Sequence, residues 1–436
     1  MNELWLRELL DRAVADEPPM GPVAASSLRA GIKQRRRRRA QGTVACLAAA
    51  ALIGTAAVAA TGTAGHLAAG PAKVTGPSTV YVLSGEGNLY PIPSATKARG
   101  KRILLPGGRQ FMAITPNGKT IYVGGDEPNA VIPVSTVTDT AGKPIQFGRQ
   151  VPNQILITPN GKTAYVLGLS GREIYPIATA TNTMEKPIRA GQGAGGLYQM
   201  VMTPDGKTLY VVSSNPAVSG PSYVIPISTA TNTPGKPIKI QSANVEIVMN
   251  PDGTAVYAID ESSAGTEVIP ISTATNTPGK PSNVGEAAGA LAITRSGQNL
   301  YLVRYGIRPG PFGVIPFSTA TNTAGKLVKV NGMVSAIAVT PDGNTAYVAS
   351  EPSQKPAVNC TGRTGEVTPI STVTNLPGHP IRVACDPYDL AVTPDGKTLW
   401  VGSRNWVTPI STATNTAGKP IKFRGALVAM VVAVSP

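Results

Sequence analysis

Short apolar segments alternate with polar turns through most of the chain, at the spacing of β-strands. In one clear stretch the apolar run 200–202 ends in a Pro-Asp-Gly turn at 204–206, and a β-branched and aromatic strand follows at 208–212. A third strand reads Val-Ile-Pro-Ile at 224–227, and a threonine-rich loop leads to a short strand near residue 238. Pro, Asp and Gly in this order favour a tight turn, and a proline within a strand favours an edge or a bulge. The stretch therefore predicts four short strands in succession.

The same pattern occurs eight times, and its first turn recurs at intervals of 42 to 53 residues. Four strands repeated at this period are typical of the blades of a β-propeller. A seven-bladed ring with one unit outside it is the alternative to eight blades. The eight second strands each carry an aromatic residue at one position: Tyr81, Tyr122, Tyr165, Tyr210, Tyr257, Tyr301, Tyr347 and Trp400.

The two ends of the repeat region complement one another. The first unit has strands near 79–83, 88–92 and 101–105, but nothing upstream resembles an innermost strand. The apolar segment at 431–436 matches the innermost strands of the other units. A first blade completed by this segment would close the ring and remove open sheet edges. We therefore expect an all-β, eight-bladed propeller over 78–436, closed by its C-terminal strand.

The repeat resembles the YVTN family of β-propeller repeats. The matching residues are the Pro-Asp-Gly-Lys phrase followed by Tyr-Val, at 204–211, and the Thr-Ala-Thr-Asn-Thr stretch at 229–233, where a preceding Ser stands in place of the family's common Asp. The resemblance covers 78–436 and implies a cell-surface or secreted protein with a binding or structural role.

The segment before the propeller indicates where the protein resides. Residues 1–40 are charged and include five consecutive arginines at 35–39, and an amphipathic helix is expected near 4–12. Residues 41–65 carry no charged side chain and are long enough to span a bilayer. Arginines before such a segment favour a cytoplasmic N-terminus, so we expect a single-pass signal anchor at 41–65, a linker at 66–77 and an extracytoplasmic propeller. A cleaved export signal and a buried helix are the alternatives.

The chain carries a formal net charge of +15. Many lysines occupy the repeat turns, where they are either solvated or form a surface for an anionic membrane or wall polymer. Aromatic residues do not interleave with the basic ones, so we expect no nucleic-acid partner. We also expect a monomer.

Residues suited to catalysis are scarce. There are two histidines, His66 in the linker and His379 in a turn, which argues against histidine-based acid–base relays and metal clusters. One carboxylate per Pro-Asp-Gly turn is too few for calcium, which needs six to eight oxygen ligands. The sequence therefore predicts no cofactor, no metal and no enzymatic activity.

The loops after the second and fourth strands vary in length and sequence between repeats, and such loops on a rigid scaffold commonly carry recognition. Polar residues at the start of the innermost strands are expected near them, at the mouth of the axial channel. These residues line either a ligand site or an ordinary solvated channel. The candidate ligand-binding residues are Tyr198, Gln199, Glu246, Arg304, Tyr388, Asp389 and Arg404.

Two cysteines fall in variable loops of the seventh repeat, and an oxidising exterior would permit a disulfide between Cys360 and Cys385.

Together these features predict a membrane-tethered propeller that binds or scaffolds a surface protein, a peptide or a cell-wall glycan. An extracytoplasmic lactonase- or lyase-like enzyme and the sensor half of a transmembrane regulator are the alternatives.

Overall fold

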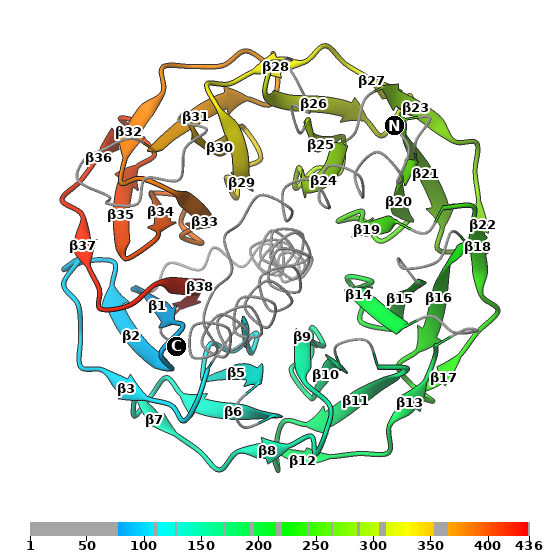
Figure 1. The fold of residues 1–436 in the computed structure, drawn as a ribbon, viewed down its shortest axis with the longest axis horizontal. Helices are drawn as coiled ribbons and strands as arrows, with labels where there is room; N and C mark the ends of the chain where they lie inside the picture. The colour runs from blue at the N-terminus through cyan, green and yellow to red at the C-terminus, as the bar shows by residue number, and fades with distance from the viewer. Residues whose placement is uncertain are drawn as a thin grey trace, which may run out of the picture. The chain divides into compact units, whose positions relative to one another are not determined.

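Eight antiparallel sheets stand around a common axis, and their strands are ordered from the axis to the rim (Figure 1). The computed structural model describes residues 77–108, 111–126, 129–168, 171–191, 196–214, 220–242, 244–262, 265–285, 288–304, 311–352 and 365–434. These residues contain no helix, so none of them forms a helix long and apolar enough to cross a bilayer. The segments predicted at 1–40, 41–65 and 66–76 lie outside the described residues.

Each sheet is one blade, numbered in chain order. Blade 1 comprises β1 (Ser78–Ser84), β2 (Asn88–Pro93), β3 (Ile103–Leu104) and the C-terminal β38 (Leu427–Val434). Blade 2 comprises β4 (Phe111–Ile114), β5 (Thr120–Asp126), β6 (Asn129–Ser135), β7 (Thr140–Ala141) and β8 (Ile145–Gln146). Blade 3 comprises β9 (Pro152–Ile157), β10 (Thr163–Gly168), β11 (Glu173–Ala178), β12 (Thr183–Met184) and β13 (Ile188–Arg189). Blade 4 comprises β14 (Gly196–Met202), β15 (Thr208–Ser214), β16 (Ser222–Ser228), β17 (Thr233–Pro234) and β18 (Ile238–Ile240).

The second half of the ring repeats this arrangement. Blade 5 comprises β19 (Val245–Met249), β20 (Ala255–Ser262), β21 (Gly265–Ser272), β22 (Thr277–Pro278) and β23 (Ser282–Gly285). Blade 6 comprises β24 (Ala288–Ile293), β25 (Asn299–Arg304), β26 (Gly313–Ser318), β27 (Thr323–Ala324) and β28 (Val328–Lys329). Blade 7 comprises β29 (Met333–Val339), β30 (Thr345–Glu351), β31 (Gly365–Ser371) and β32 (Ile381–Val383). Blade 8 comprises β33 (Pro387–Val392), β34 (Thr398–Ser403), β35 (Trp406–Ser411), β36 (Thr416–Ala417) and β37 (Ile421–Lys422).

The predicted closure and the count of eight blades are confirmed. Strand β38 pairs antiparallel with β1, from Ser78 opposite Val434 to Ser84 opposite Leu427. The two ends of the propeller sequence therefore share one sheet, and blade 1 has an innermost strand like every other blade.

The proline of the third strand explains why the outermost strand is short, because proline has no N–H to donate to a neighbouring strand. In blade 3, Pro176 lies opposite Tyr165 in β10 and accepts a 2.8 Å hydrogen bond from the N–H of Glu185. Strands β12 and β13 pair with β11 on either side of this point. Six of the eight blades have the outermost strand split in this way, so the predicted fourth strand is two short pieces there.

The hydrophobic core lies between the blades. Apolar side chains of adjacent sheets pack face to face, as when Val212 and Val224 of blade 4 meet Ala258 and Ile269 of blade 5. Because successive side chains of a strand point to opposite faces of the sheet, each blade contributes to the layer with the preceding blade and to the layer with the next, and one such layer lies between every pair of neighbours.

Candidate ligand-binding face

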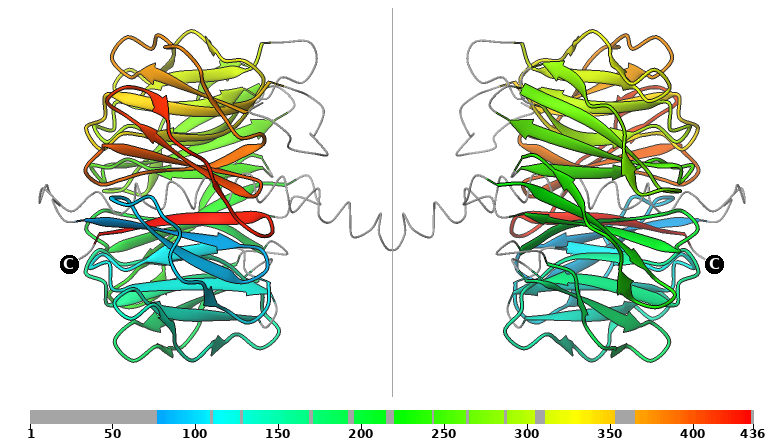
Figure 2. Two further views of the ribbon diagram at one scale, coloured as in Figure 1. Left: turned by 90° about the vertical axis from the view of Figure 1, so that its left-hand side faces the viewer. Right: turned by 90° about the vertical axis from the view of Figure 1, so that its right-hand side faces the viewer.

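The ring has two faces with different connections. Turns after the innermost and third strands lie on one face, here called the turn face, and connections after the second and outermost strands lie on the other, the loop face. The described chain enters the ring at Ser78, which pairs with Val434 near the end of β38, so both lie at the turn face (Figure 2).

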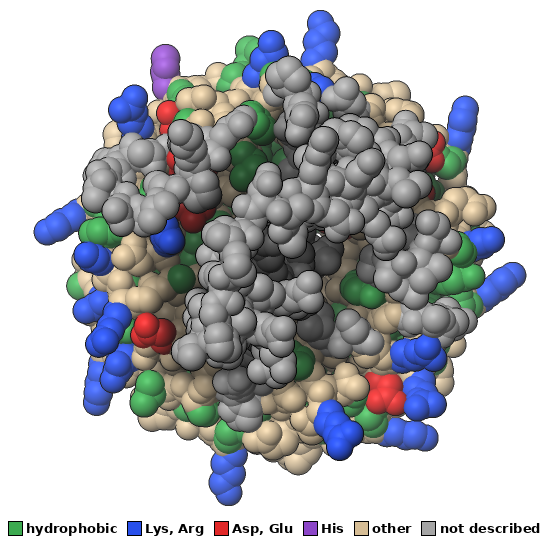
Figure 3. Space-filling view, viewed as in Figure 1, with side chains coloured by type: hydrophobic (Ala, Val, Ile, Leu, Met, Phe, Trp, Pro, Cys, Tyr) green, Lys and Arg blue, Asp and Glu red, His purple; other side chains and the backbone are tan. Residues whose placement is uncertain are grey.

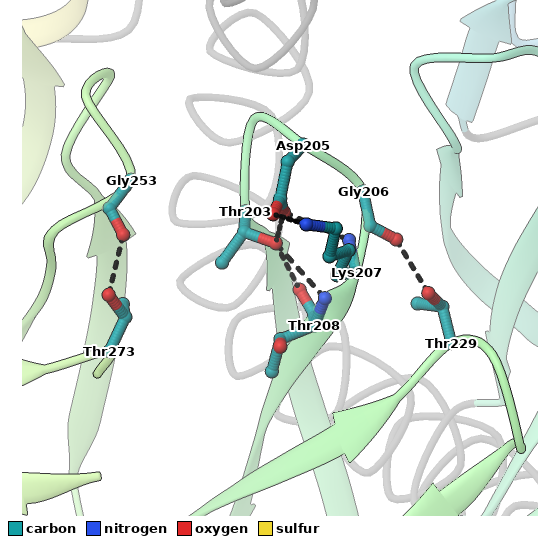
Figure 4. Close-up of polar contacts among 8 residues, drawn as sticks. All are labelled: Thr203, Asp205, Gly206, Lys207, Thr208, Thr229, Gly253 and Thr273. Atoms are coloured by element: carbon teal, nitrogen blue, oxygen red, sulfur yellow. Dashed lines mark hydrogen bonds and ion pairs between the residues drawn. The ribbon is translucent and has the colours of Figure 1, made fainter. Parts of the chain in front are cut away.

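The repeated residues of the turn face are used by the fold (Figure 4). In blade 4, the Thr203 hydroxyl lies 2.7 Å from Asp205 Oδ1, which also accepts the N–H of Lys207 at 3.0 Å. The Thr229 hydroxyl donates to the carbonyl of Gly206 at 2.6 Å and so ties the two turns of the blade together. Gly206 has a φ of +71°, and an added Cβ would meet the Pro159 ring of the preceding blade at 2.7 Å. These residues recur because each one either closes a turn or packs against the turn of a neighbouring blade.

A belt of basic residues surrounds the rim, one on each blade, and all are exposed. Lys and Arg side chains project outward around the whole ring (Figure 3). Each belongs to the outermost part of its blade, and in six blades a proline follows it directly. The belt consists of Lys101, Lys143, Lys186, Lys236, Lys280, Lys326, His379 and Lys419.

At the ends of the second strands, charged residues are more frequent in the second half of the ring. Three positions after the second-strand aromatic residue, six blades carry a small residue, and blades 5 and 6 carry Asp260 and Arg304. One position later stand Asp126, Glu261, Glu351 and Arg404 in blades 2, 5, 7 and 8. The six small residues are Ser84, Gly125, Gly168, Ser213, Ser350 and Ser403.

The boundary between blades 5 and 6 brings two of the predicted residues to facing surfaces. Glu246 lies opposite Ile259, which packs against blade 6, so the two side chains share that side of the sheet. Arg304 lies two residues beyond Leu302, which packs against blade 5 in the same apolar layer. The alternation of the strands therefore directs Glu246 and Arg304 toward each other's blade.

Glu261 joins this group on the blade 5 side. Its Oε2 accepts a 2.7 Å hydrogen bond from Asn244 Nδ2. Burial raises the pKa of the Glu261 carboxyl, the Asn244 hydrogen bond opposes that effect, and the neighbouring Asp260 adds to it. Sequence reasoning missed Asp260 and Glu261, although the break in the run of small residues was a usable signal.

Asp260 occupies the opposite side of blade 5. It lies opposite Val245, which packs against blade 4, and is 5% exposed. Ser222 lies two residues before Val224 on the facing side of blade 4 and is fully buried. Asp260 Oδ1 and Ser222 Oγ are buried and form no hydrogen bond among the described residues.

Gln199 and Asp389 are engaged within the ring. Gln199 Nε2 donates to the carbonyl of Ile247 at 3.1 Å, and its Oε1 accepts the N–H of Ile247 at 2.7 Å. Asp389 Oδ2 accepts the N–H of Met430 at 2.7 Å. Both side chains are buried and join their own blade to the innermost strand of the next.

The remaining predicted residues lie at the loop-face ends of blades 4 and 8. Tyr198 and Tyr388 stand at bulges of the innermost strands β14 and β33, and both are half-buried. The Tyr388 hydroxyl donates to the carbonyl of Leu427, and burial raises the pKa of both phenols. Arg404 is exposed directly after β34, and its carbonyl accepts the N–H of Leu427 at 2.6 Å. Tyr388 and Arg404 therefore both contact the backbone where β38 begins.

Cys385 is buried and takes part in a disulfide. Its predicted partner Cys360 lies outside the described residues, so the pairing stays a prediction. In the described part of the chain, no three His, Cys, Asp or Glu side chains come together as metal ligands.

Neither a protein-family model nor a curated protein matches the chain. The dihydro-heme d1 dehydrogenase NirN, solved in complex with DHE, aligns with a TM-score of 0.66 and 11% identity over 84% of this chain and 77% of that one. AztD from Citrobacter koseri aligns with a TM-score of 0.59 and 11% identity over 82% of this chain and 98% of that one. These likenesses show the fold alone. The YVTN resemblance stays a prediction from the repeat residues.

The comparison corrects one prediction from the sequence. NirN is a dehydrogenase and shares the propeller fold at a TM-score of 0.66. The prediction that this protein has no enzymatic activity, which rests on its few catalytic residue types, is therefore wrong as an exclusion, because the same fold occurs in an enzyme. The scarcity of histidine restricts which groups could act.

Proposed function

We propose that the propeller binds a ligand through the loop face of blades 5 to 8. The carrying observation is the uneven distribution of charge on that face: Asp260, Glu261, Arg304, Glu351 and Arg404 stand at the ends of the second strands in blades 5 to 8, whereas blades 1 to 4 carry one charged residue, Asp126, at the same two positions. A fold does not require such charges, because six blades are built with Ser or Gly at the first of these positions. Charged groups on rigid strand ends are suited to a peptide, a surface protein or a glycan.

We further propose that the protein is held at the cell membrane by residues 41–65, with 1–40 in the cytoplasm and the propeller outside. The run of arginines before an uncharged segment supports this orientation. The described chain enters the ring at the turn face, which supports placing that face toward the membrane and the loop face outward. Lysines such as Lys119 and Lys162, which are exposed in those turns, would then lie near anionic lipid or wall polymer.

Binding by the purified protein to wall polymers, a glycan array and extracted surface proteins tests the proposal. The double variant Glu246→Gln and Arg304→Gln, which removes both charges, should weaken ligand binding at least about tenfold, which corresponds to roughly 1.4 kcal/mol. A bound compound that is chemically changed during incubation would extend the proposal to catalysis.

The matched control carries Lys162→Gln and Lys207→Gln on the turn face. These changes should weaken salt-sensitive adsorption to anionic vesicles and leave ligand binding unchanged. If the turn-face variant loses the ligand and the loop-face variant keeps it, the assignment of the two faces is reversed.

A further inference from the structure

Four blades carry a polar side chain at the same place in the innermost strand: Gln154, Gln199, Glu246 and Asp389. Gln154 Oε1 accepts the N–H of Met200 at 2.7 Å, and Gln154 Nε2 donates to the carbonyl of the same residue at 3.0 Å. Gln199 makes the same two bonds with Ile247 at 2.7 and 3.1 Å. Each amide thus holds the N–H and the carbonyl of one buried residue on the edge of the next blade's innermost strand that faces away from the second strand.

Asp389 occupies this position in blade 8. Its Oδ2 accepts the N–H of Met430 at 2.7 Å, the same distance that the two glutamines reach. Met430 belongs to β38, the strand that closes the ring. An ionised carboxylate can only accept hydrogen bonds, so it cannot donate to the Met430 carbonyl as an amide does.

We propose that Asp389 is a pH-sensitive clasp at the closure of the ring. The neutral carboxyl holds both the N–H and the carbonyl of Met430, as the glutamines hold their partners. The ionised carboxylate holds the N–H alone and leaves the carbonyl of Met430 without this donor. Protonation therefore fastens β38 to blade 8, and ionisation loosens it.

The surroundings of Asp389 favour the neutral form. Burial raises the pKa of this carboxyl to about 7, although the N–H groups of Met430 and Leu390 oppose the effect. Because the pKa of Asp389 in the folded protein is raised above the ordinary Asp value of 3.8, the stabilisation of the folded ring by the neutral carboxyl is fully present below about pH 4. It is lost as the pH rises through about 7.

The charged and titratable groups around Asp389 are few. Tyr388 precedes it on β33, and Asp386 lies just before that strand. Strand β30 contributes Glu351, whose Oε2 accepts the N–H of Asp386 at 2.7 Å, and Tyr347. Arg404 follows β34, and β34, β29 and β38 themselves carry no titratable residue. Tyr388 also donates to the carbonyl of Leu427, at the loop-face end of β38.

Thermal unfolding of the full chain between pH 4 and 8 tests the clasp, with the wild type compared against Asp389→Asn. The amide accepts from Met430, can donate to it and does not titrate. The two proteins should have similar midpoints at pH 4, and the variant should unfold about 2–4 °C higher at pH 8. A constant difference across the whole range would overturn the proposal.

A second variant keeps the test decisive if Asp389→Asn does not fold. Gln154→Glu replaces an amide clasp between blades 3 and 4 by a carboxyl and should introduce a new loss of stability as the pH rises from 4 to 8. Glu351→Gln, which removes the carboxylate that accepts the N–H of Asp386, should leave the wild-type pH profile between 4 and 7 in place. If Gln154→Glu keeps the wild-type profile, a carboxyl at this position does not act as a clasp.

Discussion

The Tyr165 hydroxyl lies 2.8 Å from Asn232 Oδ1, across the boundary between blades 3 and 4. Five other boundaries have the same pair at 2.6 to 2.8 Å. The acceptor always sits in the left-handed backbone region, with a φ of 54° at Asn232. The Tyr-Val and Thr-Asn parts of the repeat are therefore partners in adjacent blades. The five other pairs are Tyr81 with Asp139, Tyr122 with Asn182, Tyr210 with Asn276, Tyr301 with Asn375 and Tyr347 with Asn415.

Tyr165→Phe should destabilise the protein by about 1 kcal/mol, because it removes one hydrogen bond and leaves the apolar packing of the ring intact. Asn232→Gly should cost a similar amount, since Gly keeps the left-handed backbone and loses only the acceptor. Asn232→Ala should cost more, because it adds the strain of a Cβ at positive φ. Denaturant unfolding measures all three. Equal losses for Gly and Ala at position 232 would show that backbone conformation contributes nothing there.

Removal of residues 426–436 should abolish cooperative unfolding or cause aggregation. The truncation deletes β38, which exposes the edge of β1 and unpacks Met430 and Val432 from the apolar layer against blade 8. Removal of 435–436 alone is the control, because these residues lie beyond β38 and should be dispensable. Calorimetry and light scattering report the outcome, and a truncated protein that melts like the intact one would refute closure by this strand.

The strands, the closure and the number of blades could be predicted because they depend on local patterns that repeat. The direction of a polar side chain on an innermost strand could not, because it depends on the next blade. Gln199 and Asp389 looked like channel residues for that reason, and each bonds to a backbone more than forty positions away. Asp260 was overlooked for a different reason: its signal lies in comparing the same position across all blades, where Ser and Gly otherwise stand.

The Lys-Pro pairs at the rim should protect the outer sheet edges. Lys236 is exposed between β17 and β18, and Pro237 has no N–H to offer to another strand. Replacing both, Lys236→Thr with Pro237→Val, should create a β-prone edge and promote association between copies. Lys236→Glu with Pro237 retained is the matched control, because a charge and the proline both remain. Light scattering against concentration distinguishes them, and a double variant that stays monodisperse would show that these residues do not guard the edge.

Reduction should destabilise the propeller through Cys385. This residue is 1% exposed and disulfide-bonded, and Cys46 and Cys360 are the other cysteines of the chain. We predict Cys360 as the partner, because a bond between the two closes a loop of about 25 residues within the seventh repeat, worth roughly 3 kcal/mol on the chain-entropy model. Cys360→Ser and Cys385→Ser should each lower the unfolding midpoint as much as reduction does. Cys46→Ser should leave it unchanged. Peptide mapping without reductant identifies the bonded pair directly, and a peptide joining Cys385 to Cys46 would replace the predicted loop with a link to the N-terminal segment.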